Sequence, residues 1–384
     1  MFSFRDYCNS INHEQARQIA VSKINTYLNS LHWDGSLETI YLYTNFTCNE
    51  QCQYCWIHNS DVDSSKMVDM RLLDRFMHDA PSMGLKRIKI SGGEPLVNPI
   101  IAQIINYLSS FGLVVEIETN ATKINELFLS QLVKPTNVLF KVSLDTIYSE
   151  GNDIITNRKN SLIETLDGIK CLRKNNLNFD IITVATTLNY ENLHELINYV
   201  RGLGASTHRI ILNIQPIGHG LDAENLNLSL SQIEILMDYV YDLNDEFINF
   251  GTLHSTLPPA FVPLDRLDLS FCAWGEAMCG IMPNGDVSVC APAFNSLSIV
   301  AGNVFDANLK DIWKSSRLFS NLREIEALEG ICGNCIFASA CRGMCRIFAK
   351  AKYGKFTSPY PFCQEMYNNG LFPQYAMKNI KDGK

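Results

Sequence analysis

The sequence predicts an α/β fold: a partial, TIM-like (βα)6 barrel of six parallel strands, followed by a cysteine-rich C-terminal extension. The first observation is that apolar, β-branched runs alternate with helical patterns over roughly 180 residues, which is typical of a parallel sheet with right-handed crossovers. The second is that six such units are too few for a closed eight-stranded barrel, so the barrel should be open. The third is that eleven of the thirteen cysteines fall into three groups, two of them beyond the last unit. Ligands of such sheets bind beyond the carboxyl ends of the strands.

The elements follow one another in a regular order. A helix is predicted over residues 12–31, where apolar residues recur at helical spacing. β-Branched runs predict strands at residues 39–44, 87–91, 114–118, 139–144, 179–186 and 209–215. Amphipathic patterns between them predict helices at about residues 68–80, 100–111, 124–132, 161–175 and 190–204. The rhythm breaks after Gly218-His219-Gly220, so we expect an N-terminal helical segment (1–36), the barrel (37–220), a linking helix and loop (221–270), the cysteine-rich domain (271–375) and a tail (376–384).

Composition and charge exclude several classes of protein. The chain has 384 residues, 46% of them hydrophobic, and a net charge of −8, so it should fold as a globular protein. The acidic balance without a Lys/Arg-rich block argues against a nucleic-acid partner. No apolar run approaches the roughly 18 residues of a membrane span, and the first residues have no basic and apolar export pattern. We therefore expect a cytoplasmic protein that binds neither nucleic acid nor membrane.

The first cysteine group follows directly after the first predicted strand. Cys48, Cys52 and Cys55 are close enough in sequence to ligate three irons of a [4Fe–4S] cluster, which leaves the fourth iron open to a small molecule. The alternative is a structural zinc site, which needs a fourth ligand. His58 is the only nearby candidate, and its spacing is unusual for zinc.

These residues resemble the radical S-adenosylmethionine (SAM) superfamily, whose hallmark is C-x3-C-x-aromatic-C after the first strand. Tyr54 stands at the aromatic position. Gly92-Gly93-Glu94-Pro95 follows the second strand, where the family has a loop that holds the methionyl amino group of SAM. The glycines allow close approach of the backbone, and Pro95 can begin a helix. A simple iron–sulfur electron carrier, a non-enzymatic alternative, has no use for this loop or for an open iron.

Further residues match the family at the ends of later strands. Glu118-Thr-Asn120 and Ser143-Leu-Asp145 resemble family runs after the third and fourth strands, although Ala121 and Thr146 replace the usual glycines. The resemblance implies SAM contacts from Asn120, Ser143, Arg158 and Gln215. An exposed position before a helix is an equally open interpretation of Arg158.

The C-terminal cysteines resemble the SPASM extension of radical SAM enzymes. The spacing is Cys272-x12-Gly285-x4-Cys290, then Cys332-x2-Cys335-x5-Cys341-x3-Cys345, then Cys363 after a gap. With Cys279 there are eight thiolates, enough for two auxiliary [4Fe–4S] clusters. The resemblance implies Cys272, Cys279, Cys290 and Cys345 as ligands of a nearer cluster, and Cys332, Cys335, Cys341 and Cys363 as ligands of a farther one. A zinc site in the 332–345 run is the alternative, and it leaves four cysteines unexplained. Cys8 and Cys171 are expected to be free or packed thiols.

The resemblance implies an enzyme that reductively cleaves SAM to a 5′-deoxyadenosyl radical, which abstracts hydrogen from the substrate. Full cysteine ligation of the auxiliary clusters favours electron transfer, and hence an oxidoreductase that modifies a peptide or protein, for example by a crosslink. Ala291 replaces the aspartate base of sulfatase-maturing enzymes, so that activity is not expected. The alternative substrate is a small metabolite such as a sugar, aminocyclitol or nucleoside, which would undergo dehydrogenation, epimerisation or decarboxylation. Either reaction needs a reductant such as flavodoxin or ferredoxin, and no catalytic acid or base can be named.

Overall fold

The computed structural model describes residues 3–30, 34–57, 63, 65–133, 135–212, 214, 217–246, 252–255, 257–267, 269, 274–297 and 299–378. Its centre is a sheet in the order β10-β9-β8-β1-β2-β3-β4-β5-β6-β7. Neighbouring strands from β8 through β1 to β7 are parallel, and β8–β9 and β9–β10 are antiparallel. The strands are β1 (Thr39–Tyr43), β2 (Arg87–Ser91), β3 (Val114–Thr119), β4 (Val138–Ser143), β5 (Phe179–Val184), β6 (Thr207–Ile211), β7 (Thr252–Ser255), β8 (Met278–Ile281), β9 (Asp286–Ser288) and β10 (Gly302–Asn303). The predicted α/β fold with an open, partial barrel is confirmed.

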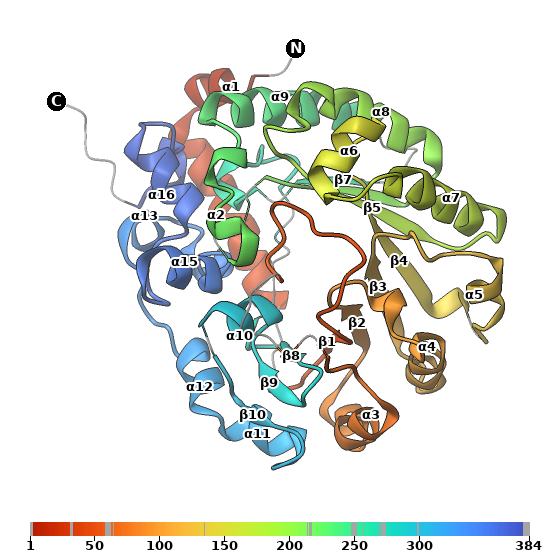
Figure 1. Cartoon of the computed structure of the whole chain (residues 1–384). Helices are drawn as coiled ribbons and strands as arrows, with labels where there is room; N and C mark the ends of the chain where they lie inside the picture. Colours follow the sequence, from red (N-terminus) through yellow and green to blue (C-terminus); the bar gives the residue numbers. More distant parts are fainter. Residues whose placement is uncertain are drawn as a thin grey trace.

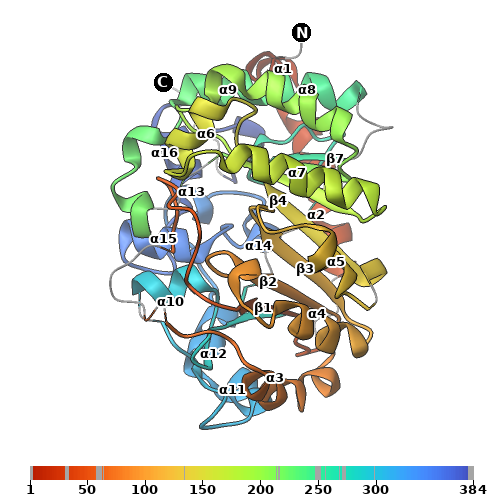
Figure 2. The same cartoon turned by 45° about the vertical axis from the view of Figure 1, so that its right-hand side comes forward.

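Helices cover the outer face of the barrel strands, as Figure 1 and Figure 2 show. They are α3 (Met70–Met77), α4 (Ile101–Ser110), α5 (Glu126–Ser130), α6 (Ser149–Thr156), α7 (Ser161–Lys174), α8 (Leu193–Leu203) and α9 (Leu230–Glu246). The C-terminal segment adds α10 (Ala291–Leu297), α11 (Leu309–Ser315), α12 (Arg317–Arg323), α13 (Gly330–Gly333), α14 (Ala338–Cys341), α15 (Arg346–Tyr353) and α16 (Pro361–Asn368). This segment lies beside β1 on the side of the barrel away from α4–α8 (Figure 1).

The two faces of the barrel strands differ because successive side chains point to opposite faces. Ile40 and Leu42 of β1 and Ile88 of β2 are fully buried in the hydrophobic core. The intervening side chains on the other face are polar. Glu116 of β3 forms ion pairs with Arg87 at 2.9 Å and Lys141 at 3.0 Å. The inner face of the barrel is therefore charged.

Four strands, β7 at one edge and β8, β9 and β10 at the other, extend the sheet beyond the six that the sequence predicts. β7 pairs with β6, and β8, from the C-terminal segment, pairs with β1 in the register Ile40↔Cys279. Four-residue strands carry too little periodicity to be recognised, and their place in the sheet depends on pairing with distant residues. The short helix α6 was also not predicted; its sequence, SEGNDIIT, carries a mixed polar pattern.

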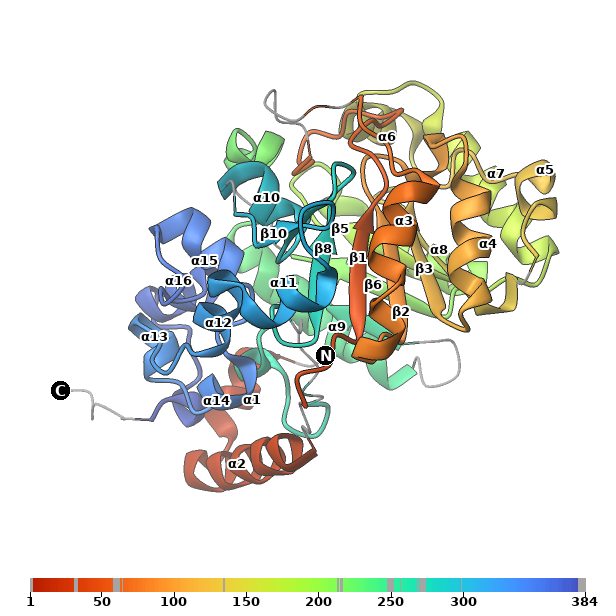
Figure 3. The ribbon, with the colours of Figure 1, turned by 90° about the horizontal axis from the view of Figure 1, so that it is seen from below.

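The N-terminal helices pack against the end of the chain. α1 (Phe4–Ser10) and α2 (His13–Ser30) precede the barrel, and α2 contacts α14 and the turn Gln374–Ala376. Figure 3 shows α2 beside the C-terminal helices. Arg17 donates a hydrogen bond to the carbonyl of Met377, and the Trp313 indole donates to Gly35 at 2.9 Å. The two ends of the sequence thus stabilise each other.

Candidate active site and metal centres

The loop after β1 brings Cys48, Cys52 and Cys55 together. The amide of Cys55 donates to the carbonyl of Cys52 at 3.1 Å, and the amide of Glu50 donates to the Cys48 sulfur at 3.4 Å. Cys55 acts electrostatically on both Cys48 and Cys52. Burial raises the pKa of Cys48 to about 12 and raises the pKa of Cys52 as well. Buried thiols at this spacing become thiolates only when cations replace their protons, which is what a metal cluster does.

The two glycines after β2 pack against the segment that leads to Cys48. Gly92 has a φ of 145°, and a Cβ on it would lie 2.3 Å from the carbonyl oxygen of Asn45. A Cβ on Gly93 would lie 2.0 Å from the carbonyl oxygen of Thr47. Hydrogen bonds join the segments, from the amide of Gly93 to Asn45 at 2.8 Å and from the amide of Glu94 to Thr47 at 2.9 Å. Backbone packing alone therefore requires both glycines, in addition to any approach of a ligand.

Glu94 joins the loops after β2 and β3. Its side chain is 1% exposed and accepts hydrogen bonds from the Thr119 hydroxyl at 2.7 Å and from the Asn120 amide at 2.8 Å. Burial raises the pKa of this carboxyl to about 7. The Asn120 side chain continues the network by donating to Asn49 at 2.9 Å, beside Cys48. Three strand ends thus meet at one polar centre.

Tyr54, in the loop after β1, contacts the segment that follows Ser143 at the end of β4. The hydroxyl of Tyr54 donates to the carboxylate of Asp145, which also accepts from the amide of Val184 at 2.8 Å. Burial raises the pKa of Asp145 to about 6. Ser143 is the last residue of β4, and its side chain is exposed. The aromatic residue of the cysteine motif thus ties the cluster loop to the fourth strand.

The remaining predicted SAM contacts have different outcomes. Arg158 forms an ion pair with Glu164 at 2.6 Å and acts electrostatically on Glu50 in the cysteine loop, so it lies near the site. Gln215 lies outside the described residues, as does His58.

Two functional residues of this site carried no clear sequence signal. Glu50 is 6% exposed beside the cysteines, and burial raises its pKa. His219 donates its amide to the carbonyl of Cys55 at 2.9 Å, and its ring approaches the carbonyl of Cys52 at 3.2 Å. A histidine between two glycines just after the last barrel strand is the feature that could have indicated this contact.

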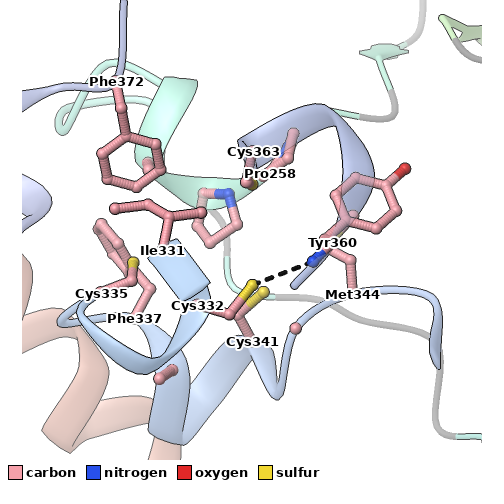
Figure 4. A pocket seen from close by; sticks show the side chains of 14 residues that line it. Pro258, Ile331, Cys332, Cys335, Phe337, Cys341, Met344, Tyr360, Cys363 and Phe372 are labelled. Atoms are coloured by element: carbon pink, nitrogen blue, oxygen red, sulfur yellow. Dashed lines mark hydrogen bonds between the residues drawn. The ribbon is translucent and has the colours of Figure 1, made fainter. Parts of the chain in front are cut away.

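Four C-terminal cysteines line one cavity, shown in Figure 4. They are Cys332, Cys335, Cys341 and Cys363. The other residues that line the cavity are mostly apolar. The amide of Tyr360 donates to the Cys332 sulfur at 3.2 Å, and burial raises the pKa of Cys341 to about 12. Four sulfurs in an apolar enclosure, with an amide already directed at one of them, fit a [4Fe–4S] cluster.

Three further C-terminal cysteines are found on β8, after β9 and at the start of α15. Cys279, on β8, is fully buried, and burial raises its pKa to about 12. A Cβ on Gly280 would lie 3.1 Å from the Cα of Cys290, which follows the end of β9. The sulfur of Cys345 accepts from the amide of Phe348 at 3.4 Å at the start of α15. Cys272 lies outside the described residues.

Among the described residues, no group of three or more His, Cys, Asp or Glu side chains is arranged to hold a single metal ion. A [4Fe–4S] cluster differs from a single ion in that its ligands bind separate iron corners. The two cysteines outside the groups are packed thiols: burial raises the pKa of Cys8 to about 12, and Cys171 is half-buried on α7. None of the described helices has the length and apolar content to cross a membrane.

Comparison with known proteins gives two families and several relatives. Residues 42–200 match the Radical SAM superfamily, and residues 272–336 match the SPASM iron–sulfur cluster-binding domain. An AdoMet-dependent heme synthase of Methanosarcina barkeri is 26% identical over 335 residues, which is 82% of this chain and 93% of the relative. The mycofactocin maturase MftC of Mycobacterium tuberculosis is 27% identical over 304 residues, 78% of this chain and 76% of the relative. The crystal structure of Streptococcus suis SuiB bound to the precursor peptide SuiA has the same fold, with a TM-score of 0.70 and 19% identity, covering 90% of this chain and 79% of SuiB.

Proposed function

Because this chain is a radical SAM enzyme with a C-terminal SPASM domain, we propose that it oxidatively modifies a peptide or protein, by a crosslink or a related change. The observation that most supports an oxidative reaction is the cavity lined by four cysteines. It would hold a cluster separate from the one in the cysteine loop after β1. A cluster with four protein ligands has no open iron for substrate and is suited to electron transfer. The named relatives support a peptide substrate, since MftC is a maturase and SuiB binds a precursor peptide.

The enzyme uses SAM, a [4Fe–4S] cluster and auxiliary clusters. When bound, the first cluster and SAM together supply the reductive cleavage that yields a 5′-deoxyadenosyl radical able to take hydrogen from the substrate. We assign Cys48, Cys52 and Cys55 as the cluster ligands. The backbone of Gly92, Gly93 and the Glu94 carboxylate would bind the methionyl ammonium, because a buried carboxylate at this centre favours a cation.

Further side chains would orient SAM from the neighbouring strand ends. Asn120 and Ser143 present polar groups from β3 and β4, and Tyr54 fixes the loop through Asp145. Arg158 and Gln215 are the remaining residues that we propose to contact SAM. Glu94 and Asp145 are 1% and 7% exposed, so little water reaches either carboxyl group.

We assign the C-terminal thiolates to two auxiliary clusters. Cys332, Cys335, Cys341 and Cys363 would bind the farther cluster in their shared cavity. Cys272, Cys279, Cys290 and Cys345 would bind the nearer one. An electron removed from the substrate radical would leave through these clusters, so the enzyme would act as an oxidoreductase. A flavodoxin or ferredoxin would supply the reducing electron, in the cytoplasm.

A second candidate substrate is a small metabolite. The heme synthase relative is named for a small-molecule product and matches 82% of this chain. The same site could then dehydrogenate, epimerise or decarboxylate a sugar, aminocyclitol or nucleoside.

The test uses anaerobically reconstituted protein with dithionite and SAM. Wild-type protein should produce 5′-deoxyadenosine, and Cys52→Ala should abolish it, whereas the matched control Cys171→Ala should retain it. Cys341→Ala should keep SAM cleavage but lose product formation. Retained turnover in Cys52→Ala would refute the assignment of the site.

The substrate is tested separately by mass spectrometry. Precursor peptides encoded beside the gene, incubated with the wild-type enzyme, should lose the mass of two hydrogen atoms. Unchanged peptides, together with turnover of a sugar or nucleoside, would favour the second candidate.

A further inference from the structure

Arg346 is a charged side chain enclosed within the C-terminal segment. It is the first residue of α15 and is 1% exposed. Its guanidinium donates to the backbone carbonyls of Ser358 at 2.6 Å, Phe356 at 3.0 Å and Gly343. Its Nε is buried and has no hydrogen-bond partner within the described part of the chain. The carbonyls fix the position of the guanidinium and leave one N–H donor unused.

Cysteines surround the charge of Arg346, and among the described residues no carboxylate forms an ion pair with it. The ionisable groups that act on it most strongly are Cys332, Cys341, Cys345 and Cys363. The charge of Arg346 in turn acts on the thiol of Cys332. A buried cation without an anionic partner is strongly destabilising. Neutral thiols do not supply that anion, but thiolates bound to a cluster do.

The absence of a side chain at Gly343 leaves space for the guanidinium of Arg346. Gly343 has a φ of 74°, and a Cβ on it would lie 2.2 Å from the Arg346 Nη2 atom. The planar guanidinium donates to three carbonyls at once, which the single ammonium of lysine cannot do in the same geometry. Both the glycine and the arginine are therefore needed for this arrangement.

The four cysteines that act on Arg346 are divided between the two proposed auxiliary clusters. Cys332, Cys341 and Cys363 line the farther cavity, and Cys345 is assigned to the nearer cluster. We propose that Arg346 is a shared counter-ion of the two auxiliary clusters and raises their reduction potentials; this rests on the ligand assignment of the proposed function. A nearby positive charge and N–H donors to sulfur favour the reduced, more negative cluster. Arg346 is thus a positioning residue that sets the energy of electron transfer between the clusters.

The test is a redox titration of the full-length, reconstituted protein followed by electron paramagnetic resonance (EPR). Arg346→Gln should lower the midpoint potential of at least one auxiliary cluster by a tenfold change in its reduction equilibrium, which is about 59 mV for one electron. Arg346→Lys keeps the charge and should give a smaller shift. The matched control is Arg342→Gln, because Arg342 donates to the Leu322 carbonyl at 3.0 Å and pairs with Glu276. Because Glu276 offsets the charge of Arg342, this control should shift the auxiliary potentials less than Arg346→Gln does.

A second measurement does not depend on the stability of the variants. In wild-type protein with ¹⁵N-labelled arginine, pulsed EPR should detect a ¹⁵N coupling to a reduced auxiliary cluster; its absence would overturn the proposal. Unshifted potentials in Arg346→Gln with full iron content would overturn it as well, as would an equal shift in Arg342→Gln. Wild-type protein with iron in the first cluster alone would instead refute the ligand assignment, and this inference with it.

Discussion

Replacing Gly93 by alanine should displace the cysteine loop by a distance that follows from the contacts of this glycine. The new Cβ would lie 2.0 Å from the Thr47 carbonyl oxygen and 2.9 Å from the Cys48 amide nitrogen. Real Cβ contacts are not closer than 3.0 Å, so the Thr47–Cys48 peptide must move by about 1 Å. Gly93 is not among the glycines with positive φ, so the clash is the only new cost.

Two magnitudes follow from this displacement. Forcing a methyl group into packed structure costs about 1–3 kcal/mol, so the free energy of unfolding should fall by that amount. Because Cys48 is a proposed cluster ligand, a shift of about 1 Å should reduce SAM cleavage on the order of 10²-fold. Urea unfolding followed by circular dichroism measures the first effect, and 5′-deoxyadenosine formation under anaerobic conditions measures the second.

The matched control is Gly202→Ala. Gly202 lies on α8, is exposed, and a Cβ there meets no atom within 4 Å. An alanine in a helix stabilises by about 0.5–1 kcal/mol relative to glycine, so this variant should be slightly more stable and fully active. Wild-type stability and wild-type SAM cleavage in Gly93→Ala would refute the argument that the two loops are locked by close packing.

Three further predictions concern stability and metal content. Gly168→Ala would place a Cβ 2.3 Å from the carbonyl oxygen of Ala121, so we expect the free energy of unfolding to fall by about 1–3 kcal/mol in a urea titration. Burial lowers the pKa of His208 to about 3, below the unfolded value near 6.5, so the stability gained by keeping this ring neutral is complete above about pH 6.5 and is lost as the pH falls. His208→Asn should therefore flatten the decline of about 1.4 kcal/mol per pH unit between pH 6 and 4, and an unchanged slope would contradict this. Removing iron with a chelator should make residues 320–363 the first cleaved in limited proteolysis, with the barrel cut later; equal cleavage rates in both regions would show that metal does not stabilise the C-terminal segment.

Periodicity predicted the barrel because each of its units carries its own signal. The pattern at 87–91 coincides with β2, since every second residue there is apolar and the next helix is amphipathic. The attachment of β8 to β1 could not be predicted, because nothing in Met278–Ile281 specifies which strand it joins. Pairing partners far apart in sequence are set by the whole fold.

The sequence predicted which residue types form the site, but it did not predict most of the packing contacts between them. The resemblance to SPASM domains implied a set of four cysteines, and these four line one cavity: Cys332, Cys335, Cys341 and Cys363. The glycines after β2 were expected to leave room for a ligand, yet they also pack on Asn45 and Thr47. The sequence does not indicate that Arg346 is buried, because arginines are ordinarily solvated surface residues.

The pairing of β8 with β1 has a consequence for how the protein is made. β1 leaves the ribosome early, but the strand that covers its free edge is not synthesised until residues 278–281. Throughout that interval β1 can pair with the edge of another chain, the usual route to aggregation. Overproduction of a version cut before residue 278 should therefore yield insoluble protein, and chaperones that bind nascent chains should matter more for this enzyme than for barrels whose first strand is sealed by its immediate neighbours.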